Sequence, residues 1–215
     1  LSGGAQCSAA RRSGTQLIHN FLAGPYIDRR AQQREDADWL NTARADDTTL
    51  FVVAHGTTHL IQVEPRPRIA FLEHSHPAVQ TATDDNALLM GWYRERRCVL
   101  IESGHAANNE TGFTFPGGTR FEELRPLTLL LDEQEAALLA YARAMSHWRR
   151  HHRFCGSCGA PMRPVRAGHV LCCSSSSCAL EVFPRLDPAI IVLVTDGEHA
   201  LLGRQASWPP GRYST

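Results

Sequence analysis

Five of the seven cysteines lie within 24 residues, and four of them have the spacing of a metal site. Cys155 and Cys158 form a CxxC motif followed by Gly159, and Cys173 and Cys178 form a second pair. Four thiolates in this C-x2-C-x14-C-x4-C pattern can close a tetrahedron around Zn²⁺ and leave no open position for water. We therefore expect a structural zinc that supplies folding energy to a segment too short to bury its own core.

The third ligand of this site is ambiguous, because Cys172 and Cys173 are adjacent. Neighbouring strand residues face opposite ways, so only one of the two can point at the metal. The four-residue loop before Cys178 favours Cys173 and leaves Cys172 as a spare thiol, with His169 as an outside candidate. The rival interpretation is a set of free or redox-active thiols, including a redox switch through Cys172 and Cys173.

Composition limits the other functions of this chain of 215 residues. It is long enough for one large or two small domains. Lys+Arg and Asp+Glu are both 22, and this balance argues against a broadly basic nucleic-acid surface. No apolar run approaches the ~20 residues of a membrane span, and no secretory signal is visible. Cysteines clustered in pairs favour a reducing compartment, so we expect a cytoplasmic protein without membrane contact.

Hydrophobic patterning predicts an α+β fold for the part of the chain before the cysteines. Residues 1–16 are small and polar, which predicts disorder, and residues 21–40 combine an aromatic turn with a charged helical piece. Short apolar runs separated by turn residues predict a small antiparallel sheet. These runs cover residues 50–53, 60–63, 69–72 and 98–101. Residues 103–119 are expected to form a loop.

One helix is clearly marked directly before the cysteine cluster. Asp132 can cap its N-terminus, and Glu135 completes a capping box. A stripe at spacings of three and four residues follows, which predicts packing against the core. The stripe contains Leu138, Leu139, Ala142, Met145 and Arg149. Residues 147–152 are rich in Arg and His, and we expect a solvated helix end there, where cations suit the helix dipole.

The last forty residues have the pattern of strands that begin a further domain. The apolar run at residues 189–194 predicts a strand buried on both faces. Asp196-Gly197 is a hairpin turn signal, after which residues 200–204 pair back. Residues 212–215 would begin a third strand. Because a buried strand pair needs a covering layer, we expect this domain to be incomplete in the chain.

Several segments together resemble the NADH pyrophosphatase (NAD diphosphatase) branch of the Nudix hydrolases. They are ARAMSHWRRHHRFCGSCG, FCGSCGAPM, CSSSSC, VFPRLDPAIIVLV, LLGRQ, PPGRYST and, more loosely, FLAGPYIDRRAQQREDADWL. The resemblance covers about residues 20–215 and is strongest over 141–215. It implies an N-terminal domain at 17–150, a zinc ribbon at 151–184 and the first strands of a Nudix α/β/α sandwich at 185–215.

This resemblance also implies a reaction. Such enzymes cleave the pyrophosphate of NADH or NAD⁺ into nicotinamide mononucleotide and AMP, and some remove NAD caps from RNA. Their carboxylates, in the motif G-x5-E-x7-R-E-[apolar]-x-E-E-x-G, hold Mg²⁺ or Mn²⁺. That motif is absent from this sequence, since Glu122-Glu123 lacks the preceding Arg-Glu. We expect the metal ligands beyond Thr215, an inactive chain on its own, and a homodimer for the full-length protein.

The resemblance carries over two substrate residues. Phe183, at the ribbon exit, would stack on a substrate ring, although plain packing is an equal alternative. Arg125 would contact the substrate, although a solvated surface position is the simpler interpretation. A different class of function is a non-enzymatic zinc-ribbon module that binds RNA or protein through a local basic patch. That patch would contain Arg149, Arg150, Arg153, Arg163 and Arg166.

Overall fold

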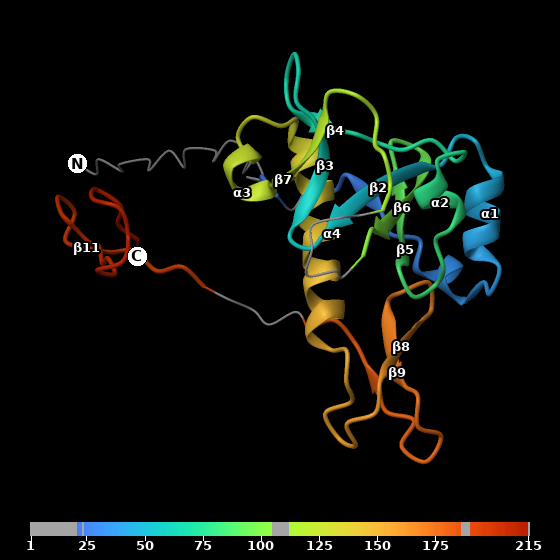
Figure 1. Ribbon diagram of the computed structural model, residues 1–215. Helices are drawn as coiled ribbons and strands as arrows, with labels where there is room; N and C mark the ends of the chain where they lie inside the picture. The colour runs from blue at the N-terminus through green and yellow to red at the C-terminus, as the bar shows by residue number, and fades with distance from the viewer. Residues whose placement is uncertain (1–20, 23, 105–111, 186–189, 215) are drawn as a thin grey trace, which may run out of the picture. The chain divides into compact units, whose positions relative to one another are not determined.

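The structure is a computed structural model that describes residues 21–22, 24–104, 112–185 and 190–214 (Figure 1). Predicted disorder at residues 1–16 falls outside these ranges. The chain divides after Pro184 into a large unit and a small C-terminal unit, which are described separately. The large unit contains a mixed sheet with its helices and the cysteine-rich ribbon.

A seven-stranded sheet organises the large unit (Figure 1). Its order is β1-β5-β6-β2-β3-β4, and β7 also pairs with β3. β2 and β6 run parallel to each other, whereas the other pairs are antiparallel. The strands are β1 Ile27–Asp28, β2 Leu50–His55, β3 Thr58–Gln62, β4 Arg68–Ile69, β5 Ala87–Tyr93, β6 Arg96–Glu102 and β7 Thr119–Glu123.

The α+β class expected from the sequence is confirmed, but the sheet is larger than expected and is not purely antiparallel. β5 was not predicted, because its run ALLM suits a buried helix as well as a strand. β7 continues from the end of the segment expected to be loop. Gly91 on β5 has a φ of 120°, and a Cβ there would lie 2.3 Å from the Asp28 carbonyl oxygen of β1. This glycine therefore permits β1 to approach β5.

Helices cover both faces of the sheet. The long helix α4 (Glu133–His151) lies over one face, with α3 (Leu124–Leu127) before it. Residues of α1 (Trp39–Ala45) and α2 (Pro77–Gln80) pack into the core on the other face. A 3-10 helix, η1 (Ala31–Glu35), precedes α1. Because both faces are covered, β2, β5 and β6 have continuous apolar runs in place of alternation.

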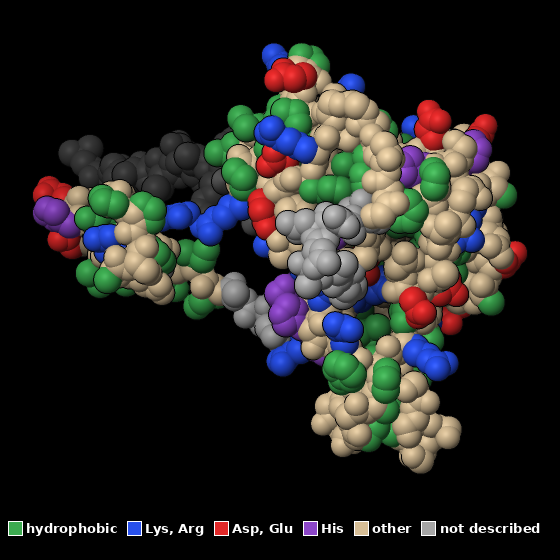
Figure 2. Space-filling view, in the orientation of Figure 1, with side chains coloured by type: hydrophobic (Ala, Val, Ile, Leu, Met, Phe, Trp, Pro, Cys, Tyr) green, Lys and Arg blue, Asp and Glu red, His purple; other side chains and the backbone are tan. Residues whose placement is uncertain are grey.

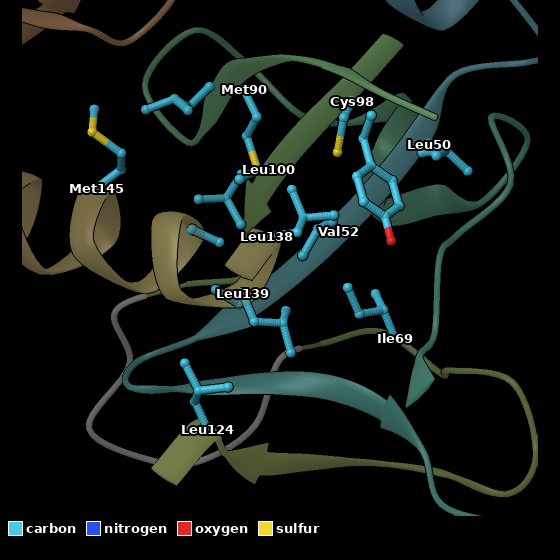
Figure 3. Packing of buried hydrophobic residues seen from close by; sticks show 14 of the residues in the cluster. Leu50, Val52, Ile69, Met90, Cys98, Leu100, Leu124, Leu138, Leu139 and Met145 are labelled. Carbon is cyan, nitrogen blue, oxygen red and sulfur yellow. The ribbon is translucent and has the colours of Figure 1, made fainter. Parts of the chain in front are cut away.

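The predicted helix stripe forms the centre of the α4 face. Leu138 and Leu139 point toward Val52 and Leu100 of the sheet (Figure 3), and all four side chains are fully buried. Alternate residues of the same strands, such as Phe51 and Val53 of β2, belong to the core on the opposite face. Every second residue of the strands therefore packs against the residues that α4 presents at intervals of three and four.

The start of α4 differs in one respect from the predicted capping box. Asp132 is the N-cap and accepts a hydrogen bond from the Gln134 N–H at 3.0 Å, as expected. Glu135 instead turns toward the sheet, where its carboxylate accepts a hydrogen bond from the Ile69 N–H at 2.8 Å. Burial raises the pKa of Glu135, whereas this backbone hydrogen bond lowers it. The residue thus ties the helix to strand β4.

The small unit contains a two-stranded hairpin, β11 (Val194–Thr195) with β12 (Ala200–Leu201). The turn at Asp196-Gly197 occurs as expected, and an isolated bridge joins Gly203 to Ser214. The prediction of a buried strand at 189–194 is wrong for the described residues. Strand geometry begins only at Val194, and Ile190 and Ile191 are more than 80 % exposed. No other described residue of this unit provides the apolar layer that such a strand needs.

Within the described parts of the chain, no helix combines the length and the apolar character needed to cross a bilayer.

Candidate metal centre and the ribbon junction

Three short strands build the ribbon that carries the cysteines. β8 (Met162–Val165) pairs with β9 (Val170–Cys173), and β9 pairs with β10 (Glu181–Val182). Cys155 and Cys158 lie on the turn before β8, Cys173 ends β9, and Cys178 lies on the following turn. The hairpin β8–β9 returns the chain to its starting point, so the two turns face each other.

Each turn is shaped by backbone hydrogen bonds and one left-handed residue. In the first turn, the Gly159 N–H donates to the Cys155 carbonyl at 2.9 Å, with a φ of 76° at Gly159. In the second, the Ala179 N–H donates to the Ser175 carbonyl at 2.9 Å, with a φ of 46° at Ala179. Glycine adopts this conformation freely, whereas alanine is strained in it. The second turn therefore contains a strained backbone at Ala179, which its hydrogen bond to Ser175 helps to hold.

The four cysteine sulfurs predicted as ligands lie within 4.8 Å of one another. The Sγ–Sγ distances are 3.7 Å for Cys155–Cys178 and 3.4 Å for Cys158–Cys173. Tetrahedral zinc with Zn–S bonds of roughly 2.3 Å separates its sulfurs by about 3.8 Å. The cluster therefore fits a zinc ion, and as four thiolates it supports a structural site.

Backbone N–H groups favour a thiolate at this cluster. Hydrogen bonds from the Cys158 and Ser157 N–H groups lower the pKa of Cys155 to about 7. The Ser175 N–H also favours a thiolate at Cys173, but desolvation and the neighbouring thiols raise its pKa to about 12. Four sulfurs this close cannot all be ionised without a cation between them. Zinc binding must therefore release protons, and its affinity falls as the pH falls.

The structure separates the alternative third ligands. Cys173 belongs to the sulfur cluster, whereas the Cys172 sulfur lies outside it, 3.7 Å from the Cys173 carbonyl oxygen. This is the alternation expected along a strand. His169 lies elsewhere, since its Nε2 is 2.6 Å from the Leu89 carbonyl oxygen on β5. Burial lowers the pKa of His169 to about 4, so its neutral ring can donate to that carbonyl.

His169 belongs to a junction between ribbon and sheet that sequence reasoning missed. The turn joining β8 to β9 packs on β5, where the Leu89 N–H donates to the Ala167 carbonyl at 3.1 Å. Gly168 has a φ of 87°, and a Cβ there would lie 3.1 Å from the Ala87 carbonyl oxygen. Leu89 therefore bonds to the turn through both its N–H and its carbonyl, beside the irregular register between Leu89 and Gly91.

A buried ion pair lies beside the same junction. The Arg149 guanidinium is 3.4 Å from the Glu102 carboxylate, and both side chains are more than 90 % buried. Arg149 also donates to the Ala87 carbonyl at 3.0 Å and to the Asp85 carbonyl. The predicted solvated helix end is thus wrong for Arg149 and for Trp148, which is also buried. The signal in the sequence that Arg149 faces inward was its position in the apolar stripe of the helix.

The remaining predicted site residues lie apart from the sulfur cluster. Phe183 directly follows β10 and is 51 % exposed, so its ring is available for stacking. Arg125 lies on α3 and is exposed. The expected basic patch is divided: Arg149 is buried, and Arg166 forms an ion pair with Glu35 at 3.4 Å. Arg150 is half-buried, and Arg153 and Arg163 are exposed.

Comparison with known proteins explains this order of domains. Residues 48–148 match the family described as NADH pyrophosphatase-like rudimentary NUDIX domain, and residues 150–183 match the NADH pyrophosphatase zinc ribbon domain. The chain therefore combines two domains of NADH pyrophosphatase type, a rudimentary NUDIX domain and a zinc ribbon. The NUDIX match covers strands β2 to β7 and most of α4, and the zinc ribbon match contains the four sulfurs.

Named relatives are similar to about half or more of the chain. The chain is 41 % identical over 152 residues to "NAD-capped RNA hydrolase NudC" of Stutzerimonas stutzeri, covering 65 % of this chain and 54 % of that protein. It is 41 % identical over 144 residues to the protein of that name from Pseudomonas aeruginosa, covering 61 % and 51 %. It is 40 % identical over 116 residues to "Nudix hydrolase 19, chloroplastic" of Arabidopsis thaliana, covering 49 % and 26 %. The chain spans about half the length of the bacterial relatives.

Proposed function

We propose that this chain is part of an NAD(H) diphosphatase that hydrolyses the pyrophosphate of NADH or NAD⁺ to nicotinamide mononucleotide and AMP. The observation that carries the proposal is the rudimentary NUDIX domain followed directly by the matching zinc ribbon. The names of the two bacterial relatives add NAD-capped RNA as a second substrate class. We place the protein in the cytoplasm, where thiols stay reduced and available to zinc.

In this proposal the ribbon is a structural part of the enzyme. Cys155, Cys158, Cys173 and Cys178 hold one zinc ion, which fixes the two turns and through them the path of the chain after β10. Four sulfur ligands leave no open position, so this zinc activates no water. Chemistry on a pyrophosphate instead needs Mg²⁺ or Mn²⁺ held by carboxylates, and the motif that supplies them is not within these 215 residues.

Two residues are proposed to contact the substrate. Phe183 would stack on a ring of the dinucleotide, which its exposed position at the end of the ribbon allows. Arg125 would contact a phosphate from its exposed position on α3. We further propose that the full-length protein is a homodimer.

The test compares the 215-residue chain with the full product of its gene. Both are incubated with NADH and Mn²⁺, and nicotinamide mononucleotide and AMP are quantified by chromatography. We expect turnover by the full product and none by the 215-residue chain. Turnover by the shorter chain would contradict the assignment of the metal ligands, and inactivity of the full product toward NADH and NAD-capped RNA would contradict the proposed reaction.

A further inference from the structure

A groove of about 590 Å³ lies within the large unit, where the ribbon meets the end of α4. Its walls come from the turn before β5, the end of β6, the end of α4, and the ribbon, including Leu171 of β9. The lining residues that bear on binding are Asp85, Glu102, Arg149, Arg153, Phe154 and Arg163. This volume suits one or two nucleotides.

Basic side chains dominate the open part of the groove. Arg149 and Glu102 neutralise each other in its wall, since they form the buried ion pair. Arg153 and Arg163 are exposed, and neither guanidinium has a carboxylate partner among the described residues. Figure 2 shows arginine and histidine side chains gathered where the ribbon joins the rest of the unit. Apart from the paired Glu102, Asp85 is the acidic residue of the lining.

An aromatic ring lies beside one of these arginines. Phe154 lines the groove and is 63 % exposed, so its ring is available for stacking. The Arg153 guanidinium lies over its ring at 5.9 Å from the centroid. An exposed aromatic ring beside unpaired arginines is the combination that binds single-stranded nucleic acid, because bases stack on the ring and phosphates contact the cations.

We propose that this groove binds single-stranded RNA, with Phe154 stacking on a base and Arg153 and Arg163 contacting phosphates. The inference deepens the proposed function and rests on it for the source of the RNA, the strand attached to an NAD cap. The groove is preformed, because the Leu89 junction and the Arg149–Glu102 pair fix the ribbon against the sheet. We therefore expect the groove to bind RNA that has no cap as well as capped RNA.

The test measures binding of an uncapped, fluorescently labelled RNA octamer to the zinc-loaded chain by anisotropy at several salt concentrations. Arg153→Ala/Arg163→Ala should weaken binding about tenfold or more at 50 mM salt and lower the salt slope by about 1.4, because two phosphate contacts are lost. Phe154→Ala should weaken binding about tenfold, and Phe154→Trp should restore it. The same sequence as a duplex should compete poorly.

A variant that removes a negative charge from the groove should strengthen RNA binding. Asp85→Asn removes the open carboxylate of the lining and keeps the side chain's shape, so binding should tighten about two- to fivefold at 50 mM salt. Asp47→Asn is its matched control, because Asp47 is exposed and lies away from the groove. Its neighbour Thr48 contacts Arg96 at the start of β6, whereas Glu102 of the groove is at the end of β6. Arg66→Ala, in the exposed loop between β3 and β4, is the control for arginine loss. Both controls should change binding less than 1.5-fold.

Several outcomes would overturn the groove assignment. They are no binding at 20 mM salt, equal weakening by Arg66→Ala, or an Asp85→Asn variant that binds no better than wild type. Thermal melting and zinc content of each variant show whether it is folded. Because the RNA has no cap, binding can fail while NADH hydrolysis by the full product persists, and hydrolysis can fail while binding persists. The two proposals are therefore tested separately.

Discussion

The sheet and the ribbon obtain their stability in different ways, although they lie in one unit. The sheet buries apolar side chains on both faces, with α4 on one and α1 and α2 on the other. Besides two of its cysteines, the ribbon buries only the short run from Ala167 to Leu171 among its described residues. A sheet of this size can fold by hydrophobic burial, whereas a ribbon of about thirty residues needs its metal. The difference predicts which perturbations each region tolerates.

The largest effect is expected from removing one of the four cysteine sulfurs, which should unfold the ribbon and leave the sheet folded. Cys173→Ala should abolish stable zinc binding and unfold the ribbon, because zinc contributes on the order of 10–16 kcal/mol in such sites. Elemental analysis should find zinc falling from one ion per chain to none, while the far-ultraviolet signal of the sheet persists. Cys172→Ala is the matched control and should keep its zinc. Loss of zinc in both variants, or in neither, would contradict the assignment of the third ligand.

A core substitution should show the reverse pattern. Leu138→Ala removes a fully buried side chain between α4 and the sheet, so the free energy of unfolding should fall by about 2–5 kcal/mol. Leu129→Ala, at a position 86 % exposed, should change it by less than about 0.5 kcal/mol. Urea unfolding followed by tryptophan fluorescence measures both, and zinc content should remain unchanged. Zinc loss in Leu138→Ala would show that the regions do not differ as described.

Acid should destabilise the sheet through His59. Burial, with the charges of Arg143 and Arg150, lowers the pKa of His59 from 6.5 to about 4. The unfolded chain therefore binds a proton that the folded chain excludes, and stability is lost as the pH falls from 6.5 toward 4, by up to about 3 kcal/mol. Neither ring nitrogen has a hydrogen-bond partner among the described residues. His59→Leu should reduce this loss in urea unfolding at pH 7 and pH 5, and an unchanged pH dependence would exclude His59 as its source.

The smallest expected effect concerns the start of α4. Asp132→Ala removes the side chain that caps the helix, which should lower the free energy of unfolding by about 1 kcal/mol. Asp132→Asn, which keeps an acceptor oxygen, should lower it less. Thermal melting distinguishes the two, and equal losses would assign the effect to the ion pair of Asp132 with Arg94.

Sequence reasoning succeeded where the signal is local. The cysteine spacing and strand alternation identified the sulfur cluster and selected Cys173, and the cap with its apolar stripe located α4. It failed where partners are far apart in the chain. Arg149 meets Glu102 across 47 residues, and Glu135 meets Ile69 across 66. No local pattern encodes such pairs, and the apolar run at 190–193 shows that hydrophobicity alone does not make a buried strand.

The two contacts of Leu89 with the ribbon turn couple one residue of the sheet to the segment that carries the metal site. Its amide hydrogen is held by Ala167 rather than by a neighbouring strand. Deuterium uptake at that single amide would therefore report whether the distant sulfurs are filled, and would do so without any label on the ribbon itself.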